Sequence, residues 1–211
     1  MLIGGGYTPL IRFKGFEDEW MTIKLCDISK KVIEKNATSV CQDVFTNSAE
    51  FGVINQRDFF DHDVANVDNI QGYYIVRPND YVYNPRISTT APVGPINRNK
   101  LGCCGVMSPL YYVFRVEKQS DGILHFLDYY FKSNMWHDFM FKNGNSGARS
   151  DRFSISDSTF SLMPILYPQK EEEQLNIGQV FINMEKLMRT ESIKLSKFRS
   201  MKQSMIKKMF V

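Results

Sequence analysis

The sequence predicts a mixed α+β (α/β) globular body followed by one long C-terminal α-helix. Two patterns predict this fold class. Aromatic and β-branched runs alternate with turn residues and one helical pattern over residues 1–168, whereas apolar residues recur at helical spacing over residues 169–211. Hydrophobic residues make up 43% of the chain and aromatic residues 13%, which is enough apolar surface for a folded core. We therefore expect two parts, divided after residue 168.

The body carries signals for several strands and one helix. Residues 71–84 (QGYYIVRPNDYVYN) hold two aromatic and β-branched runs around a polar turn at 77–80, which predicts a strand, a turn and a second strand. Residues 110–117 (LYYVFRVE) predict another strand. Residues 123–141 place their apolar side chains near one face, as an amphipathic helix does.

The C-terminal segment is predicted to form a single helix from about residue 169 to residue 208. No proline follows Pro168 and Gly178 is the only glycine there, so nothing should interrupt a helix of ~60 Å. Steps of four and three residues from Ile177 to Met209 meet apolar side chains at eight of ten positions. These apolar seam residues are Ile177, Phe181, Met184, Met188, Leu195, Phe198, Met205 and Met209.

The length of this helix predicts a partner for it. A body of 168 residues cannot cover a seam of that length, so we expect part of the helix to form an intermolecular coiled coil. Glu191 and Lys202 occupy the two polar seam positions. We interpret them as residues that fix the register of the paired helices, because an isolated polar seam residue destabilises other alignments of the two chains. The alternative is a surface helix of a single domain.

Charge is divided unevenly along the chain. The net charge is +3, but residues 169–211 carry nine basic and five acidic side chains, so the body is nearly neutral. No acidic residue follows Glu191. We therefore expect the end of the helix to meet an acidic partner, or an apolar one with solvated lysines around it.

Two long polar loops, at 85–102 and 142–152, are candidate nucleic-acid contacts. Their arginine, lysine, asparagine and hydroxyl side chains are the types that donate to phosphate oxygens and base edges in double-stranded DNA. The alternative is that they form solvated turns. The candidate residues are Arg86, Ser88, Thr89, Thr90, Arg98 and Lys100 in the first loop and Lys142, Asn145, Arg149 and Arg152 in the second.

Catalytic signatures are missing from the sequence. The three histidines have no metal or triad spacing, and no phosphate-binding loop precedes a helix, so we predict no catalytic residue, no metal and no cofactor. No apolar run reaches the ~20 residues of a membrane span, and no secretory signal is recognisable, which predicts a cytoplasmic protein. The four cysteines are interpreted as reduced, mostly buried thiols.

Several segments, taken in order, resemble the specificity subunits of type I restriction-modification systems. The resemblance begins with residues 9–16 (PLIRFKGF) and continues with 81–86 (YVYNPR) and 105–114 (GVMSPLYYVF). It ends with Pro168 and residues 173–177, which run into the long helix. Met107 departs from the family pattern, which usually has a small β-branched residue there.

This resemblance implies a target recognition domain at 1–168 that reads one half of a split site in double-stranded DNA. Residues 169–211 are then the conserved-region helix, which acts as a spacer, dimerises and docks the methyltransferase (modification) subunit. The restriction and translocase subunit is a further implied partner. The methyl donor and ATP are expected on those partner subunits, because the family's specificity subunit has no catalytic residues.

The chain departs from the family in having one recognition domain and one spacer helix instead of two of each. We therefore expect a homodimer through the helix that reads a palindromic split site. One alternative is a truncated fragment that pairs with a different half-subunit or acts as a decoy. Another, from a different class, is a stand-alone metal-dependent nuclease that uses His62 or His137 with neighbouring aspartates.

Overall fold

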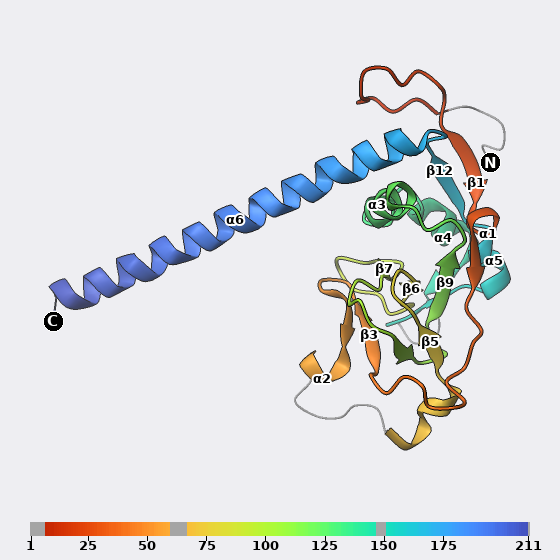
Figure 1. Cartoon of the computed structure of the whole chain (residues 1–211), viewed down its shortest axis with the longest axis horizontal. Coiled ribbons are helices and arrows are strands. Elements are labelled where there is room, and N and C mark those ends of the chain that lie inside the picture. The colour runs from red at the N-terminus through yellow and green to blue at the C-terminus, as the bar shows by residue number, and fades with distance from the viewer. Residues whose placement is uncertain (1–6, 60–66, 147–150, 211) are drawn as a thin grey trace.

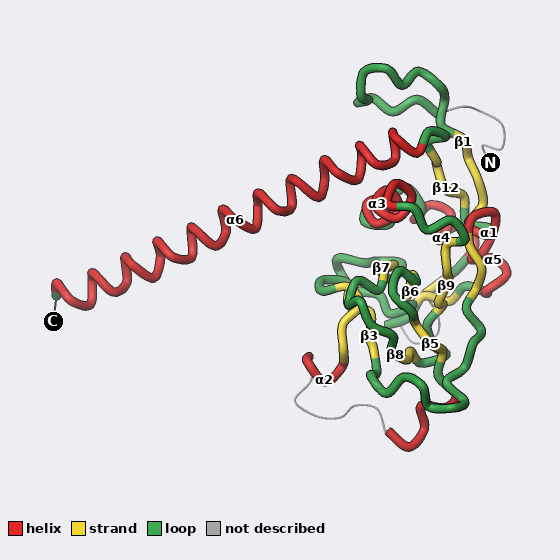
Figure 2. The backbone as a smooth tube through the Cα atoms, in the orientation of Figure 1, coloured by secondary structure: helices red, strands yellow, loops and turns green. Residues whose placement is uncertain are grey.

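A computed structural model describes residues 7–59, 67–146 and 151–210, and it has the predicted fold class. A body of short strands and helices gives rise to one helix, α6 (Glu171–Met209), which projects far beyond it (Figures 1 and 2). The single long helix predicted from the seam is thus confirmed. Within the described ranges, no helix combines the length and apolarity needed to cross a membrane.

The centre of the body is a four-stranded antiparallel sheet in the order β2–β9–β6–β7. Its strands are β2 (Ser29–Lys31), β9 (Tyr112–Val116), β6 (Tyr81–Tyr83) and β7 (Ile96–Arg98). The other described strands form antiparallel pairs. These pairs are β1 (Met21–Lys24) with β12 (Pro164–Tyr167), β3 (Phe45–Ser48) with β4 (Gly52–Asn55), β5 (Tyr74–Val76) with β8 (Gly105–Met107), and β10 (Asn145–Ser146) with β11 (Phe153–Ser154).

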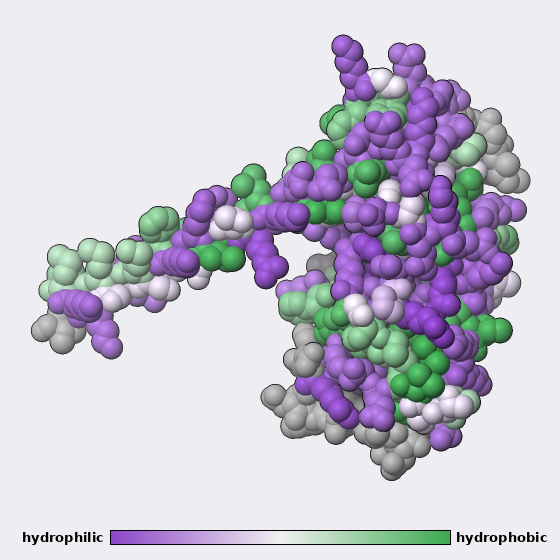
Figure 3. Space-filling view, viewed as in Figure 1, coloured by the Kyte–Doolittle hydropathy of each residue, from purple (hydrophilic) through white to green (hydrophobic). Residues whose placement is uncertain are grey.

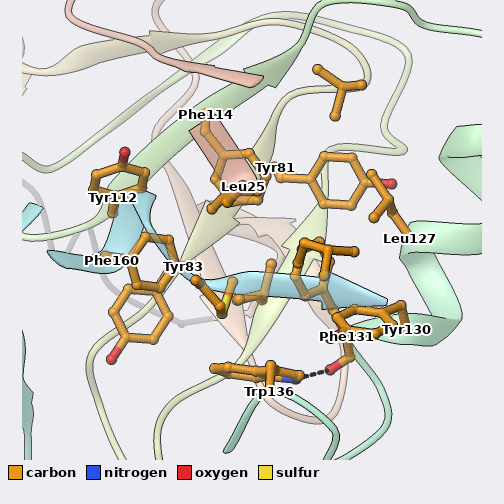
Figure 4. Close-up of a cluster of buried hydrophobic side chains, with 14 of the residues drawn as sticks. Leu25, Tyr81, Tyr83, Tyr112, Phe114, Leu127, Tyr130, Phe131, Trp136 and Phe160 are labelled. Atoms are coloured by element: carbon orange, nitrogen blue, oxygen red, sulfur yellow. Dashed lines mark hydrogen bonds between the residues drawn. The ribbon is translucent and has the colours of Figure 1, made fainter. Parts of the chain in front are cut away.

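Short helices surround this sheet. They are α1 (Leu25–Ile28), α2 (Gln56–Phe59), the 3-10 helix η1 (Val67–Gly72), α3 (Asp121–Tyr130), α4 (His137–Asn143) and α5 (Asp157–Ser161). The main core lies between the central sheet and α3, α4 and α5 (Figure 4). There Tyr81 and Phe114 stack with ring centroids 5.3 Å apart, and the indole of Trp136 donates to the carbonyl of Phe131.

The strand predicted at 110–117 is confirmed as β9. The predicted strand, turn and strand at 71–84 correspond to β5 and β6, but these two strands belong to different sheets. The single helix predicted at 123–141 is wrong, because α3 ends at Tyr130 and α4 begins at His137. At the break, the Ser133 hydroxyl donates to the carbonyl of Tyr130, an interaction that competes with helix continuation.

The prediction of four reduced, mostly buried thiols is also wrong. Cys41 and Cys104 form a disulfide with their Cα atoms 6.1 Å apart, and the two free cysteines, Cys26 and Cys103, are exposed. A bridge between Val44 and Val106 brings these distant segments side by side. The pairing depends on tertiary structure, which the spacing of cysteines in the sequence does not reveal.

Helix α6 is rooted on α3 through two glycines. An added Cβ at Gly178 would overlap the Cβ of His125, and one at Gly122 would lie 2.9 Å from the backbone oxygen of Glu171. Only glycine therefore permits this close approach of the two helices. Farther along, Glu185 accepts hydrogen bonds from the Tyr129 hydroxyl at 2.9 Å and from the Lys132 ammonium at 2.6 Å.

The N-terminal segment is tied to the same root. The buried carboxylate of Glu173 accepts hydrogen bonds from the Arg12 guanidinium at 2.7 and 2.9 Å and from the Trp20 indole at 3.1 Å. Next to it, the Gln174 amide donates to the carbonyl of Pro168 at 2.8 Å. Residues from the first and last of the family-like segments thus meet at the start of α6.

Beyond Glu185, helix α6 leaves the body (Figure 1). Its apolar seam is exposed there, with Met188 at 71% and Met209 at 72% of their full accessibility. Figure 3 shows hydrophobic side chains along this projecting part. A helix lying on the surface of a single domain would cover its seam, whereas the described body leaves this part of the seam exposed.

Candidate DNA-binding surface

The two predicted loops lie side by side. The amide of Ile87 donates to the carbonyl of Asp151 at 3.0 Å, and the amide of Phe153 donates to the carbonyl of Pro85 at 2.8 Å. Arg86 and Arg152 face each other across this antiparallel bridge, and both are exposed. Two exposed guanidinium groups from distant parts of the sequence therefore lie on one surface.

A groove of about 390 Å³ separates the first loop from the β3–β4 hairpin. Arg86, Ser88 and Thr90 line one side. Residues 46–50 of the hairpin and Tyr111 also line the groove. The Tyr111 and Thr46 hydroxyls are 3.1 Å apart, so the groove combines the Arg86 guanidinium with hydroxyl groups, which suit phosphates and base edges. The Glu50 carboxylate also lines the groove.

A network of asparagines holds the two sides of the groove together. Asn47, only 1% exposed, donates from its side chain to the carbonyl of Val82 at 2.7 Å and to that of Pro95 at 3.1 Å. Its side-chain oxygen accepts from Asn97 at 2.8 Å, and its backbone carbonyl accepts from Asn84 at 2.7 Å. The oxygen of Asn84 in turn accepts from the amide of Arg86 at 3.0 Å. The hairpin therefore fixes the backbone of Arg86 through two asparagines.

The tip of the first loop is a tight turn. The Ser88 hydroxyl accepts from the amide of Ala91 at 3.1 Å and lies 3.2 Å from the Thr90 hydroxyl. Thr89 is exposed at the tip. Gly94 closes the loop with φ of +85°, where an added Cβ would overlap the carbonyl oxygen of Asn84. The turn thus presents hydroxyl groups on a constrained backbone.

The first loop ends earlier than predicted, because residues 96–98 form β7. Arg98 at the end of β7 and Lys100, also predicted to contact DNA, line a separate pocket beside residues 49–53 of the hairpin. Arg98 is 11% exposed and forms a two-pronged ion pair with the buried carboxylate of Asp128, at 2.9 and 2.7 Å. Lys100 reaches the same carboxylate at 2.7 Å, and Tyr81 donates its hydroxyl to it at 3.1 Å. This ion pair holds the Arg98 guanidinium against the body. The candidate DNA-binding surface therefore does not include Arg98.

Burial affects the ionisation of this cluster. Burial lowers the pKa of the Arg98 guanidinium, but its hydrogen bonds and its attraction to Asp128 outweigh that effect and raise its pKa overall. Burial, together with the charge of Asp128, raises the pKa of the Tyr81 hydroxyl well above its usual value. The cluster is therefore a charged Arg98–Asp128 pair capped by a neutral phenol.

The candidate residues of the second loop are spread out. Lys142 lies in the last turn of α4, and Asn145 is exposed in β10, which pairs with β11. Arg149 lies outside the described residues. Composition alone indicated neither the β3–β4 hairpin nor Asn47, because their role depends on pairing between distant segments.

The residues required by the nuclease alternative do not form a metal site in the described part of the chain. There, no three histidine, cysteine or carboxylate side chains are grouped as metal ligands. His137 packs edge-on against Trp136 with ring centroids 4.7 Å apart, and burial lowers its pKa. His62 lies outside the described residues.

Comparison with known proteins gives matches among solved structures. No family model matches the sequence, and no curated protein matches it. A chain solved in work on the "complex assembly and conformational transition of the type I R-M system" superposes with a TM-score of 0.57 and 12% identity, over 88% of this chain and 46% of that one. The HsdS subunit from Thermoanaerobacter tengcongensis superposes with a TM-score of 0.49 and 14% identity, over 87% of this chain and 41% of that one.

The chain thus spans about half the length of the solved chains that it resembles, covering 46% of the first. At 12% identity, the first match concerns the fold. It agrees with the fold expected from the order of motifs in the sequence. The sequence-based resemblance is confirmed at the level of the fold: this protein has the fold of a chain from the type I R-M system.

Proposed function

We propose that this chain is a non-catalytic specificity subunit of a type I restriction-modification complex and that it reads one half of a split site in double-stranded DNA. The observation that carries this proposal is the groove between the β3–β4 hairpin and the first loop, beside the paired Arg86 and Arg152. A body with nearly neutral charge has little general attraction for DNA. Its affinity should therefore come from this local surface and from partner subunits.

In this proposal, two copies of the chain pair through α6 and place two recognition bodies at a set separation. The exposed apolar seam of α6 supports the pairing, and the two-fold symmetry of such a dimer matches a palindromic split site. The methyltransferase subunit docks on the helices and supplies the methyl donor, and the restriction and translocase subunit supplies ATP-driven steps. The assembly acts in the cytoplasm.

The modified DNA motif tests this function. The chain is co-expressed with its modification subunit, and the methylated sites of the host genome are mapped. We expect one split motif whose halves are inverted copies of each other. An asymmetric motif would replace the homodimer with pairing to a different half-subunit, and no modified motif would favour a decoy. Metal-dependent cleavage by the purified chain would favour the nuclease.

Replacing Arg86 with alanine should weaken binding to the target duplex. The loss of binding free energy should be about 1–3 kcal/mol if the guanidinium reads a guanine. If it contacts a phosphate instead, the variant should bind all sequences more weakly. The slope of log binding constant against log salt concentration should then fall by about one. Fluorescence anisotropy of target and random duplexes over a salt series, with the modification subunit present, measures both. Arg77→Ala is the matched control, because this exposed arginine lies at the other end of β6 and pairs with Glu34. Unchanged binding by both Arg86→Ala and Arg152→Ala would rule out this surface.

A further inference from the structure

We propose that the paired α6 helices lock in one register, the one that places Glu191 of each copy opposite Lys202 of the other, which only antiparallel helices allow. This inference rests on the proposed pairing through α6 and adds its register and the two residues that lock it. It starts from the two polar positions of the seam, which sequence analysis left without a defined partner. Both lie on the exposed part of the helix.

The seam has a centre of symmetry. The seam alternates between the a and d positions of a heptad repeat. In an antiparallel coiled coil, an a residue of one helix faces a d residue of the other, and the two chains run in opposite directions. The numbers of two facing residues therefore always add up to the same sum. Taking Glu191 opposite Lys202 places the centre between Ser196 and Lys197. The other layers are then apolar throughout: Leu195 faces Phe198, Met188 faces Met205, and Met184 faces Met209.

Other alignments with the same repeat are less favourable. Sliding the antiparallel pair by one heptad in either direction places each charged seam residue against an apolar one. Glu191 would then face Met209 or Leu195, which would bury its charge without a partner. A parallel pair would place Glu191 against Glu191 and Lys202 against Lys202, so like charges would meet twice.

The positions that flank the seam give an independent argument for the same orientation. In a parallel pair, Lys194 of each copy would lie beside Arg199 of the other, and these like charges repel. In the antiparallel register, Lys194 lies beside Met201 and Arg199 lies beside Ser192. The apolar stem of a lysine can cover a methionine while its ammonium stays in water.

The body leaves room for this pair. Its contacts with α6 run to Glu185, and the proposed overlap of residues 184–209 is about 39 Å long, so it occupies the projecting part of the helix. Near the root, the seam residue Ile177 packs against the core and Phe181 packs on the Tyr129 ring, with ring centroids 4.9 Å apart. The apolar seam residues from Met184 onward are exposed. A second helix that covers the seam from Met184 onward therefore need not displace the body.

The present contact of Glu191 does not oppose the pairing. Its carboxylate lies 2.8 Å from the Lys194 ammonium one turn away, and both side chains are more than half exposed. Exposed pairs of this kind contribute little to stability. In the dimer, Glu191 can therefore exchange this partner for Lys202 of the second copy.

Charge reversal in the full-length chain tests the register. Glu191→Lys alone and Lys202→Glu alone should each weaken dimerisation on the order of 10- to 100-fold, because each makes two like-charged contacts across the dimer. The double variant Glu191→Lys/Lys202→Glu should recover the parental affinity, since opposite charges again face each other. Sedimentation equilibrium at low salt measures these constants. Lys197→Glu, on the side of the helix away from the seam, is the matched control and should change little.

Each result has a distinct meaning. If the parent dimerises but single variants do too, with equal affinity, the register is wrong while the homodimer stands. If the single variants weaken the dimer and the double variant does not restore it, the register is also wrong. A parent that stays monomeric, with and without the modification subunit, overturns the homodimer itself and with it the register.

Cross-linking gives a second readout that does not depend on charge. In a background with Cys26→Ser and Cys103→Ser, chains carrying Met188→Cys are mixed with chains carrying Met205→Cys and oxidised. The antiparallel register predicts links only between the two kinds of chain. Links within the Met188→Cys population would indicate parallel helices and overturn the proposal.

Discussion

Replacing Asp128 with alanine should lower the free energy of unfolding by about 3–5 kcal/mol, because it leaves a buried charge without its partner. The Asp128 side chain is 5% exposed, and it neutralises Arg98, which is 11% exposed. The loss also deprives the Tyr81 hydroxyl of one acceptor in the centre of the core. Urea unfolding followed by circular dichroism measures the effect.

The control for this variant is Glu117→Ala. That carboxylate also pairs with a cation, Lys30, but its side chain is 51% exposed, so its loss should cost no more than about 1 kcal/mol. Equal losses in the two variants would show that the Arg98–Asp128 pair is not a buried structural element. Arg98 would then return to the set of candidate DNA contacts.

Replacing Asn47 with alanine should affect both stability and DNA binding. The change removes the partner shared by the carbonyls of Val82 and Pro95 and the side-chain amide of Asn97. Pro95 keeps the amide of Asn84 and Asn97 keeps the carbonyl of Ser48, so the cost should be about 1–3 kcal/mol. The hairpin would lose these side-chain hydrogen bonds, whereas the bond from Asn84 to the backbone carbonyl of residue 47 would remain. We therefore expect weaker binding to the target duplex at temperatures where the variant is still folded.

Thermal unfolding and fluorescence anisotropy separate the two effects. The matched control is Asn183→Ala, because Asn183 accepts a hydrogen bond from Gln179 in an exposed part of α6, outside both candidate loops, and should change neither quantity much. A destabilised Asn47→Ala that binds target DNA with parental affinity would show that the position of the hairpin does not matter for recognition. A variant as stable as the parent would contradict the role of the network.

The sequence predicted the long helix well because its evidence is local and repeated. Each turn from Ile177 to Met209 adds the same signal, and no proline interrupts it. Strand β9 was predictable for a similar reason, since Tyr112, Val113 and Phe114 form one aromatic and β-branched run. Such signals do not depend on where the rest of the chain lies.

Features that depend on distant segments were not predictable in this way. Arg98 lies in a polar loop by composition, and only the fold reveals its pairing with Asp128, 30 residues away. The Cys41–Cys104 disulfide spans 63 residues, and the Asn47–Asn97 contact spans 50. The candidate groove was therefore half predictable: the loop of Arg86 was recognised from its side chains, but the hairpin opposite it was not.

The glycine-lined root of α6 turns a small packing error into a large displacement. From Gly178 to Met209 the helix spans about 46 Å, so a tilt of about 5° at Gly178 would move its tip by about 4 Å. That displacement is close to the ~3.4 Å rise of one base pair. In a paired assembly, adding a single methyl group at position 178 would thus alter the number of base pairs that separate the two half-sites.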